Sequence, residues 1–244
     1  MENQIKMVKK QVVILHGWQS HINNWRRFIK CFSASYKIYL PVLPGFATNR
    51  LTKPFALDNY ISWLVDYLKK NKIDKPILIS HSFGARIALK YASQTNSLNK
   101  LILINAAGIK NRLNLKIILG LSAAKLGKVI FKLPFFIKYK TLASWIMYTI
   151  INEKDYFNAY PELKETMKRI INVDLGKLLN KIQAPTLIIW GAEDRITPIS
   201  HGYQLNKGIK NSHLVIIDKA GHNLPFAKSK DCADIIMNFI KLTS

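Results

Sequence analysis

Short apolar runs alternate along the chain with longer segments whose apolar residues recur at helical spacing. Six runs read as buried strands, at 11–15, 36–40, 76–80, 100–104, 186–190 and 213–217. Runs that are apolar throughout, rather than alternately polar, are typical of parallel sheets covered on both faces. The pattern therefore predicts an α/β fold with a mostly parallel central sheet and helices on both faces.

The segment 57–70 shows the helical pattern most clearly. Its apolar residues form one stripe at i, i+3, i+4, i+7, i+8 and i+11, namely Leu57, Tyr60, Ile61, Leu64, Val65 and Leu68. Such a stripe predicts a helix that packs against the sheet, with Lys69 and Lys70 on its opposite face.

A long insertion separates the fourth expected strand from the fifth. About 80 residues lie between Asn105 and Thr186, too many for a single crossover helix. Helical patterns within it cover 113–131, 135–151 and 161–171. We therefore expect two parts of the chain, a core formed by residues 1–107 and 184–244 and a helical cap formed by residues 108–183.

Ser82 stands where the strand at 76–80 runs directly into a helical pattern. A turn this sharp forces a positive φ on the serine and leaves room only for small neighbours, here Ser80 and Gly84. The helix behind it aims free N–H groups at the space above the hydroxyl, which favours acyl transfer. On this motif alone, a serine that merely caps the helix remains the alternative.

A serine nucleophile needs a histidine base and a carboxylate that orients the base. Asp194 and His222 each follow one of the last two expected strands, so both fall at the sheet edge where Ser82 is expected. Glu193 is an adjacent rival to Asp194, which could also cap the next helix. His222 could be a plain turn residue.

The order Ser82, Asp194, His222 is that of the α/β-hydrolases, unlike that of trypsin-like or subtilisin-like enzymes. The family's other motifs stand in order as His16-Gly17-Trp18, Leu43-Pro44-Gly45-Phe46 and Gly221-His222. Over nearly its whole length, the chain resembles an α/β-hydrolase of the small serine esterase type with a helical cap. It departs from the family pattern at Ser80, where the family has the first glycine of the elbow, and in the loop Val42 to Asn49.

Backbone N–H groups of Trp18 and Phe83 are the candidates for an oxyanion hole, because Gly17 lets the chain turn toward the serine. The side chains of Trp18, Phe46 and Phe83 could line an apolar substrate pocket, although aromatic residues are core residues by default. His21, in a polar loop, is a further candidate for substrate contact, with a solvated histidine as the alternative.

Three polar residues near the serine are expected to be structural. His81 alternates away from the nucleophile along the strand, and His16 resembles the family's oxyanion-turn histidine. Arg86 lies one turn along the following helix and is expected to form a buried ion pair.

The chain is strongly basic, with a formal net charge of +23. The stretch Lys110 to Lys140 carries eight basic residues among apolar ones, which could attract an anionic membrane surface or an acidic carrier protein. The 30 Lys against 7 Arg favour composition bias as the cause. Nucleic acid is not expected as a partner, because arginine is scarce and no recognition motif is present.

Cys31 and Cys232 are the two cysteines, and their spacing indicates neither a disulfide framework nor a zinc site. We expect no metal and no organic cofactor. The start of the chain lacks a signal-peptide core, and its apolar runs fall short of the roughly 20 residues that span a bilayer. We therefore expect a cytoplasmic protein without a transmembrane segment.

These residues predict a serine hydrolase that cleaves carboxylic esters of small to medium apolar acyl groups, or lactones, through an acyl-enzyme on Ser82. An esterase for acyl groups on an acidic carrier protein remains open. A carbon–carbon bond hydrolase usually has an aromatic residue after the histidine, where this chain has Asn223. A non-catalytic ligand-binding protein of the same fold is the third alternative.

Overall fold

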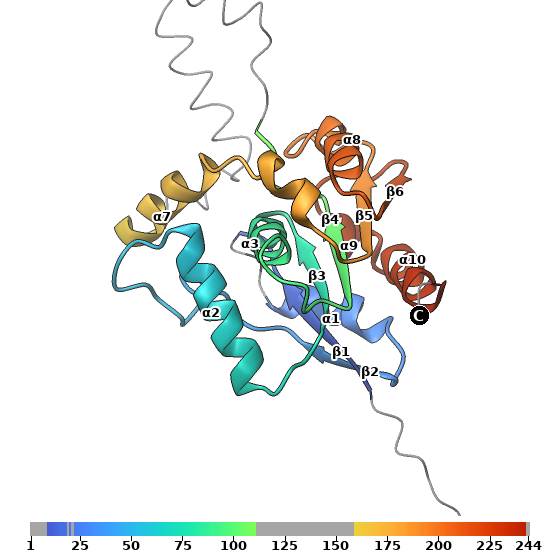
Figure 1. Ribbon diagram of the computed structural model, residues 1–244, viewed down its shortest axis with the longest axis horizontal. Coiled ribbons are helices and arrows are strands. Elements are labelled where there is room, and N and C mark those ends of the chain that lie inside the picture. Colours follow the sequence, from blue (N-terminus) through green and yellow to red (C-terminus); the bar gives the residue numbers. More distant parts are fainter. Residues whose placement is uncertain (1–8, 19, 21, 111–158, 243–244) are drawn as a thin grey trace, which may run out of the picture.

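The computed structural model describes residues 9–18, 20, 22–110 and 159–242 of the 244-residue chain. The strands of the described residues form a six-stranded sheet in the order β2-β1-β3-β4-β5-β6, and every pairing is parallel (Figure 1). Their bounds are β1 (Lys10–Leu15), β2 (Tyr36–Tyr39), β3 (Ile77–His81), β4 (Lys100–Ile104), β5 (Thr186–Gly191) and β6 (Ser212–Ile217). Each strand lies within one residue of its predicted bounds, and the parallel sheet is confirmed.

Helices cover both faces of this sheet, as the apolar runs predict (Figure 1). The helices α1 (Ile22–Lys30), α9 (Leu224–Ala227) and α10 (Ser229–Leu242) contribute to one buried cluster. The other cluster draws on α2 (Leu57–Lys70), α3 (Phe83–Ala92), α7 (Pro161–Ile171), α8 (Ile199–Gly208) and the 3-10 helix η2 (Gly176–Lys181). The helices predicted at 57–70 and 161–171 are found with those bounds.

Successive residues of a strand point to opposite faces, and this alternation feeds the two clusters. In β1, Val13 and Leu15 belong to the cluster under α2 and α3, whereas Val12 and Ile14 belong to the cluster under α1 and α10. All four side chains are fully buried. Uniformly apolar strands are therefore required here, because neither face meets water.

The last part of the expected cap, α7, is attached to the core by hydrogen bonds. Tyr160 Oη accepts from the N–H of Leu51 and Thr166 Oγ1 accepts from the N–H of Phe55, each at 2.7 Å. Arg86 on α3 donates to the carbonyl oxygens of Ile170 and Val173, each at 3.0 Å. The helices expected at 113–131 and 135–151 lie outside the described residues.

The buried ion pair expected for Arg86 is wrong, because the structure gives this side chain other partners. Its guanidinium bonds to carbonyl oxygens at the end of α7, and Asp174 acts on it only through its charge. Burial lowers the pKa of Arg86 to about 10, which still leaves the side chain charged at neutral pH. Among the described residues, no helix combines the length and apolar character that crossing a membrane requires.

Candidate active site

The candidate site lies at the carboxyl edge of the sheet, between β1 and β3. The chain runs from β1 outward to β2 and then returns to β3 on the other side of β1, so the direction of winding changes at this pair. Ligands of open α/β sheets bind outside the strand ends at such a point. Gly17 follows β1 and Ser82 follows β3, and a Cβ atom added to Gly17 would lie 3.5 Å from that of Ser82.

Ser82 occupies a strained turn between β3 and α3. Its backbone has φ 49° and ψ −114°, in the left-handed half of conformational space that non-glycine residues rarely adopt. Gly84 faces the end of β1 so closely that a Cβ atom would lie 2.3 Å from the carbonyl oxygen of Leu15. Ser80 is buried, and its Oγ donates to the carbonyl of Ile102 at 3.2 Å, so a serine fits where the family has glycine.

Ser82, His222 and Asp194 form one hydrogen-bonded chain. Oγ of Ser82 lies 2.9 Å from Nε2 of His222, and Nδ1 of His222 lies 2.8 Å from Oδ2 of Asp194. An ionised carboxylate only accepts hydrogen bonds, so Nδ1 carries the proton and Nε2 is left to accept from the serine hydroxyl. This tautomer is the one that a general base next to a serine requires.

The carboxylate of Asp194 is held by four donors. Oδ1 accepts from the N–H groups of Ile196 and Thr197 at 2.8 and 2.9 Å, and Oδ2 accepts from the Thr197 hydroxyl at 2.7 Å as well as from His222. Burial by itself would raise the pKa of Asp194, but the hydrogen bonds from His222 and Thr197 outweigh it and lower the pKa. Glu193, the adjacent rival, is exposed. The geometry thus favours Asp194 as the carboxylate partner.

The backbone of His222 is fixed from two sides. His81 Nε2 donates to the carbonyl oxygen of His222 at 2.9 Å, and Asn105 Nδ2 donates to the same oxygen at 2.9 Å. Burial, with a smaller contribution from nearby His222, lowers the pKa of His81 to about 3, so its ring is neutral. His81 therefore supports the loop that carries His222, in agreement with the structural role expected for it.

Sequence reasoning missed two residues of this network, Asn105 and Thr197. Each residue has a feature in the sequence that could have indicated its role. Asn105 is a polar residue directly after the apolar run of β4, at the same sheet edge as Ser82. Thr197 stands three residues after Asp194, at the spacing from which a backbone N–H can bond back to an aspartate.

The two oxyanion candidates flank Ser82. His16 Nε2 accepts from the N–H of Leu43 at 3.1 Å, so the neutral ring carries its proton on Nδ1, which donates to the Gly17 carbonyl at 2.7 Å. Because the C=O and N–H of a trans peptide point in opposite directions, the N–H of Trp18 points away from His16. The N–H of Phe83 is in the first turn of α3, where N–H groups have no partner within the helix.

The predicted pocket aromatics pack on one another. The ring of Trp18 meets those of Phe46 and Phe83 edge to face, with centroids 5.0 and 5.3 Å apart. Phe46 and Phe83 are buried, and all three rings belong to or pack on the cluster that lies beneath α2 and α3. Phe83 directly follows Ser82, so this group of rings packs in the core next to the turn that carries the serine. His21, the fourth candidate, lies outside the described residues.

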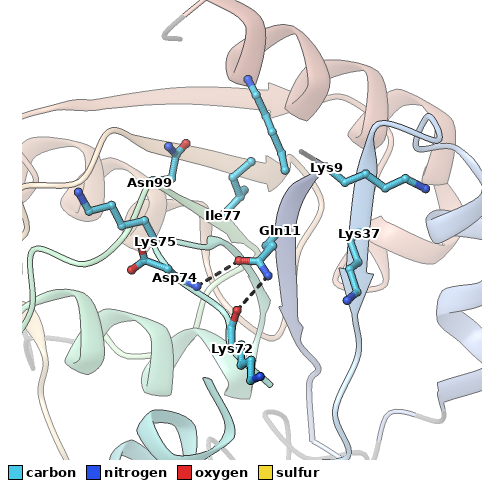
Figure 2. A pocket seen from close by; sticks show the side chains of 9 residues that line it. Lys9, Gln11, Lys37, Lys72, Asp74, Lys75, Ile77 and Asn99 are labelled. Atoms are coloured by element: carbon cyan, nitrogen blue, oxygen red, sulfur yellow. Dashed lines mark hydrogen bonds between the residues drawn. The ribbon is translucent and has the colours of Figure 1, made fainter. Parts of the chain in front are cut away.

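A cavity of about 660 Å³ lies at the opposite, amino edge of the sheet (Figure 2). It is lined by Lys9, Lys10, Gln11, Lys37, Lys72, Asp74, Lys75, Ile77 and Asn99. Gln11 closes its floor by accepting from the N–H of Asp74 at 3.1 Å and donating to the carbonyl of Lys72 at 3.3 Å. The lining residues offer no serine, cysteine or histidine, so this cavity is separate from the chemistry at Ser82.

Comparison with known proteins matches the arrangement to one family. Residues 12–235 fit the model of the alpha/beta hydrolase family. The hydrolase YugF of Bacillus subtilis (strain 168) is 26% identical over 259 residues, which cover 96% of this chain and 90% of the relative.

One further relative and one solved structure are similar over nearly the whole chain. A pimeloyl-[acyl-carrier protein] methyl ester esterase of Neisseria meningitidis serogroup B (strain ATCC BAA-335 / MC58) is 24% identical over 95% of this chain and 93% of its own length. The crystal structure of MGS-M2, an alpha/beta hydrolase enzyme from a deep-sea metagenome library, superposes with a TM-score of 0.73 at 20% identity. That match covers 98% of this chain and 92% of the other, and it shows the same fold.

Proposed function

The chain belongs to the α/β hydrolase family, and we propose that it is a serine hydrolase that cleaves carboxylic esters of small to medium apolar acyl groups, with lactones as a related class. The observation that supports this most directly is the continuous chain from Ser82 through His222 to Asp194, at 2.9 and 2.8 Å. Those are hydrogen-bonding distances for a nucleophile, its base and the group that orients the base.

In the proposed reaction, His222 Nε2 takes the hydroxyl proton as Ser82 Oγ attacks the ester carbonyl carbon. The negative charge moves to the carbonyl oxygen, which the N–H groups of Trp18 and Phe83 would receive. Collapse breaks the bond to the alcohol, which leaves with the proton returned by His222. A water molecule, deprotonated by His222, then attacks the acyl carbonyl carbon, and the bond to Ser82 Oγ breaks as His222 returns the proton to Oγ and the acid is released. Asp194 stabilises the imidazolium that forms in each half.

The proposed substrate class rests on a further proposal, that Trp18, Phe46 and Phe83 form one wall of the pocket next to Ser82. These rings offer apolar contact and no charged partner, so the acyl chain is the part of the substrate that gains from binding. Each buried CH₂ contributes up to about 0.8 kcal/mol. We further propose that the cap, residues 108–183, completes the pocket on the side away from the sheet.

Covalent labelling and a substrate series test the proposal. A fluorophosphonate should label the wild-type protein on Ser82 and leave Ser82→Ala unlabelled. With p-nitrophenyl esters of graded acyl length, kcat/KM should rise with each CH₂ until the pocket is full and then fall. A wild-type protein that is neither labelled nor active on any of these esters would favour the non-catalytic ligand-binding alternative and refute the proposal.

A second candidate is an esterase for acyl groups carried by an acidic carrier protein. Two observations favour it: the Neisseria meningitidis relative is named for such a substrate, and this chain has a net charge of +23. The basic stretch Lys110 to Lys140 would supply the docking charge, although all of it after Lys110 lies outside the described residues. Composition bias, with 30 Lys against 7 Arg, explains the charge more simply.

Salt separates the two candidates. If the lysines dock an acidic carrier, kcat/KM for a carrier-linked methyl ester should fall steeply with added salt, whereas a small neutral ester should be barely affected. Changing Lys125, Lys128 and Lys132 together to Gln should reproduce the salt effect. We expect both substrates to respond alike, and a selective loss on the carrier-linked ester would promote the second candidate.

A carbon–carbon bond hydrolase would instead turn over a vinylogous diketone faster than any ester.

A further inference from the structure

Asn105 joins the two loops on which the base and its carboxylate partner stand. Its Oδ1 accepts from the N–H of Gly191, at the start of the loop that leads to Asp194, at 2.9 Å. Its Nδ2 donates to the carbonyl oxygens of Gly221 and His222, each at 2.9 Å. The amide orientation follows from these partners, because an N–H can only donate and a carbonyl can only accept.

The place of Asn105 in the sheet explains this reach. Asn105 follows β4, which lies between β3, the strand that ends at the serine, and β5, the strand that ends at the acid loop. Gly191 passes so close to the base loop that a Cβ atom there would lie 2.3 Å from the carbonyl oxygen of Ala220. A single short side chain can therefore bridge the two loops.

Asn105 is held in its own strained conformation. Its φ of 43° is positive, like that of Ser82, and its side chain is fully buried. Its N–H donates to the carbonyl of Ile189 at 3.0 Å, and its carbonyl oxygen lies 3.3 Å from the Thr197 hydroxyl oxygen. Strain of this kind persists only where the surrounding contacts hold it, and it gathers at functional sites.

We propose that Asn105 is a positioning residue that sets the separation of His222 from Asp194. This inference rests on the proposed function, because alignment of the base matters only if His222 takes the serine proton. The side-chain hydrogen bonds of Asn105 all go to backbone groups. They hold the backbone of His222 and Gly191, the last residue of β5, so the loss of Asn105 would let the two loops move apart without removing either member of the pair.

Two substitutions divide the bridge. Asn105→Ala removes both ends, whereas Asn105→Asp keeps the shape and the acceptor for Gly191 and places an oxygen against the two carbonyls. Both should lower kcat on the best p-nitrophenyl ester by about 10- to 100-fold with KM nearly unchanged, because a small misplacement of a base costs that much. Asn71→Ala is the matched control: Asn71 Nδ2 also donates to a backbone carbonyl, that of Tyr67, at 2.8 Å, but at the end of α2. It should leave kcat unchanged.

A double-mutant cycle distinguishes positioning from general support. If Asn105 acts through the pair, Asn105→Ala should cost less than about threefold in an Asp194→Asn background, since the alignment is already lost there. An equal cost in both backgrounds, or full activity of Asn105→Ala with Asn105→Asp, would overturn the inference while leaving the proposed function intact. If Asn105→Ala does not fold, Asn105→Asp carries the cycle. A wild-type protein without Ser82-dependent turnover would overturn both.

Discussion

The hydroxyl of Thr197 donates to Oδ2 of Asp194 at 2.7 Å, the same carboxylate oxygen that lies 2.8 Å from Nδ1 of His222. One oxygen of Asp194 thus accepts hydrogen bonds from both His222 and the uncharged hydroxyl of Thr197. The Thr197 N–H donates to the other oxygen at 2.9 Å, so a single residue forms hydrogen bonds with both oxygens of the carboxylate. These two hydrogen bonds fix the plane of the Asp194 carboxylate and, through it, the direction in which His222 faces Ser82.

Removal of the Thr197 hydroxyl should therefore weaken the pair. In Thr197→Val the side chain keeps its shape but loses the donor, and a hydrogen bond to a charged group contributes about 1.5–3 kcal/mol. We expect kcat to fall by up to about 10-fold in esterase assays, since part of that energy is recovered by relaxation. Thr197→Ser should restore most of the activity. Equal activity of the Val and Ser variants would show that the hydroxyl has no part in holding the acid.

The nucleophile and the base should behave as one unit. Ser82→Ala and His222→Ala should each lower kcat by on the order of 10⁴ to 10⁶, and the double variant should lose little more. The reason is that each group is useless without the other. Steady-state rates of the three variants, with fluorophosphonate labelling of the histidine variant, provide the measurement. Losses that multiply in the double variant would contradict the assignment.

Asp194 and its neighbour Glu193 provide an internal control. Asp194→Asn should lower kcat by on the order of 10³ to 10⁴, because the amide cannot stabilise the imidazolium and favours the wrong tautomer. Glu193→Gln alters an exposed side chain and should leave the rate unchanged. Glu193→Gln should also keep the wild-type melting temperature, whereas Asp194→Asn should lower it near neutral pH, because a carboxylate whose pKa is lowered by folding stabilises the folded state there. The opposite ranking of the two rates would move the acid by one residue.

His81 should make the fold sensitive to acid. Its pKa is about 3 in the folded protein, because burial disfavours the charged ring, against about 6.5 in an unfolded chain. As the pH falls below about 6.5, the unfolded state binds a proton that the folded state does not, so the free energy of unfolding decreases. The contribution is about 1.4 kcal/mol per pH unit until the pH reaches the folded-state pKa.

His81→Gln tests this dependence, because glutamine can still donate to the carbonyl of His222 but does not titrate. Urea unfolding at pH 7 and pH 5 should show a smaller loss of stability in this variant than in the wild type. His213→Gln changes an exposed histidine and is the control. It should lose as much free energy of unfolding between pH 7 and pH 5 as the wild type. If the wild type and His81→Gln lost the same free energy of unfolding between pH 7 and pH 5, burial would not disfavour the protonation of His81 in the folded state.

The sheet could be predicted from sequence because its strands are buried on both faces. An uninterrupted apolar run such as β4, Leu101 to Ile104, has no surface alternative, and polar residues end it on both sides. The bounds of α2 were predicted correctly, but its buried face is narrower than the predicted stripe, because Ile61 is half-buried and Val65 is exposed. The candidate site could be predicted from chain order, since Ser82, Asp194 and His222 each lie in the segment that follows a strand of one parallel sheet.

Partners of polar side chains could not be read from sequence. Arg86 was given a carboxylate partner, yet it bonds to carbonyl oxygens, because the end of a helix supplies unpaired acceptors that no sequence pattern displays. Asn105 and Thr197 were missed since their roles depend on which loops the sheet order brings together. The order β3-β4-β5 decides that, and apolar periodicity carries no information about strand order.

The attachment of α7 through Arg86 responds to acid differently from the loop of His222. A guanidinium with a pKa of about 10 keeps its charge throughout the acid range, and the carbonyl oxygens of Ile170 and Val173 have no proton to gain. As the pH drops, protonation of the buried His81 therefore destabilises the loop of His222, whereas the hydrogen bonds from Arg86 to the end of α7 are kept. Acid would therefore disturb the loop that carries His222 while α7 stays attached to α3.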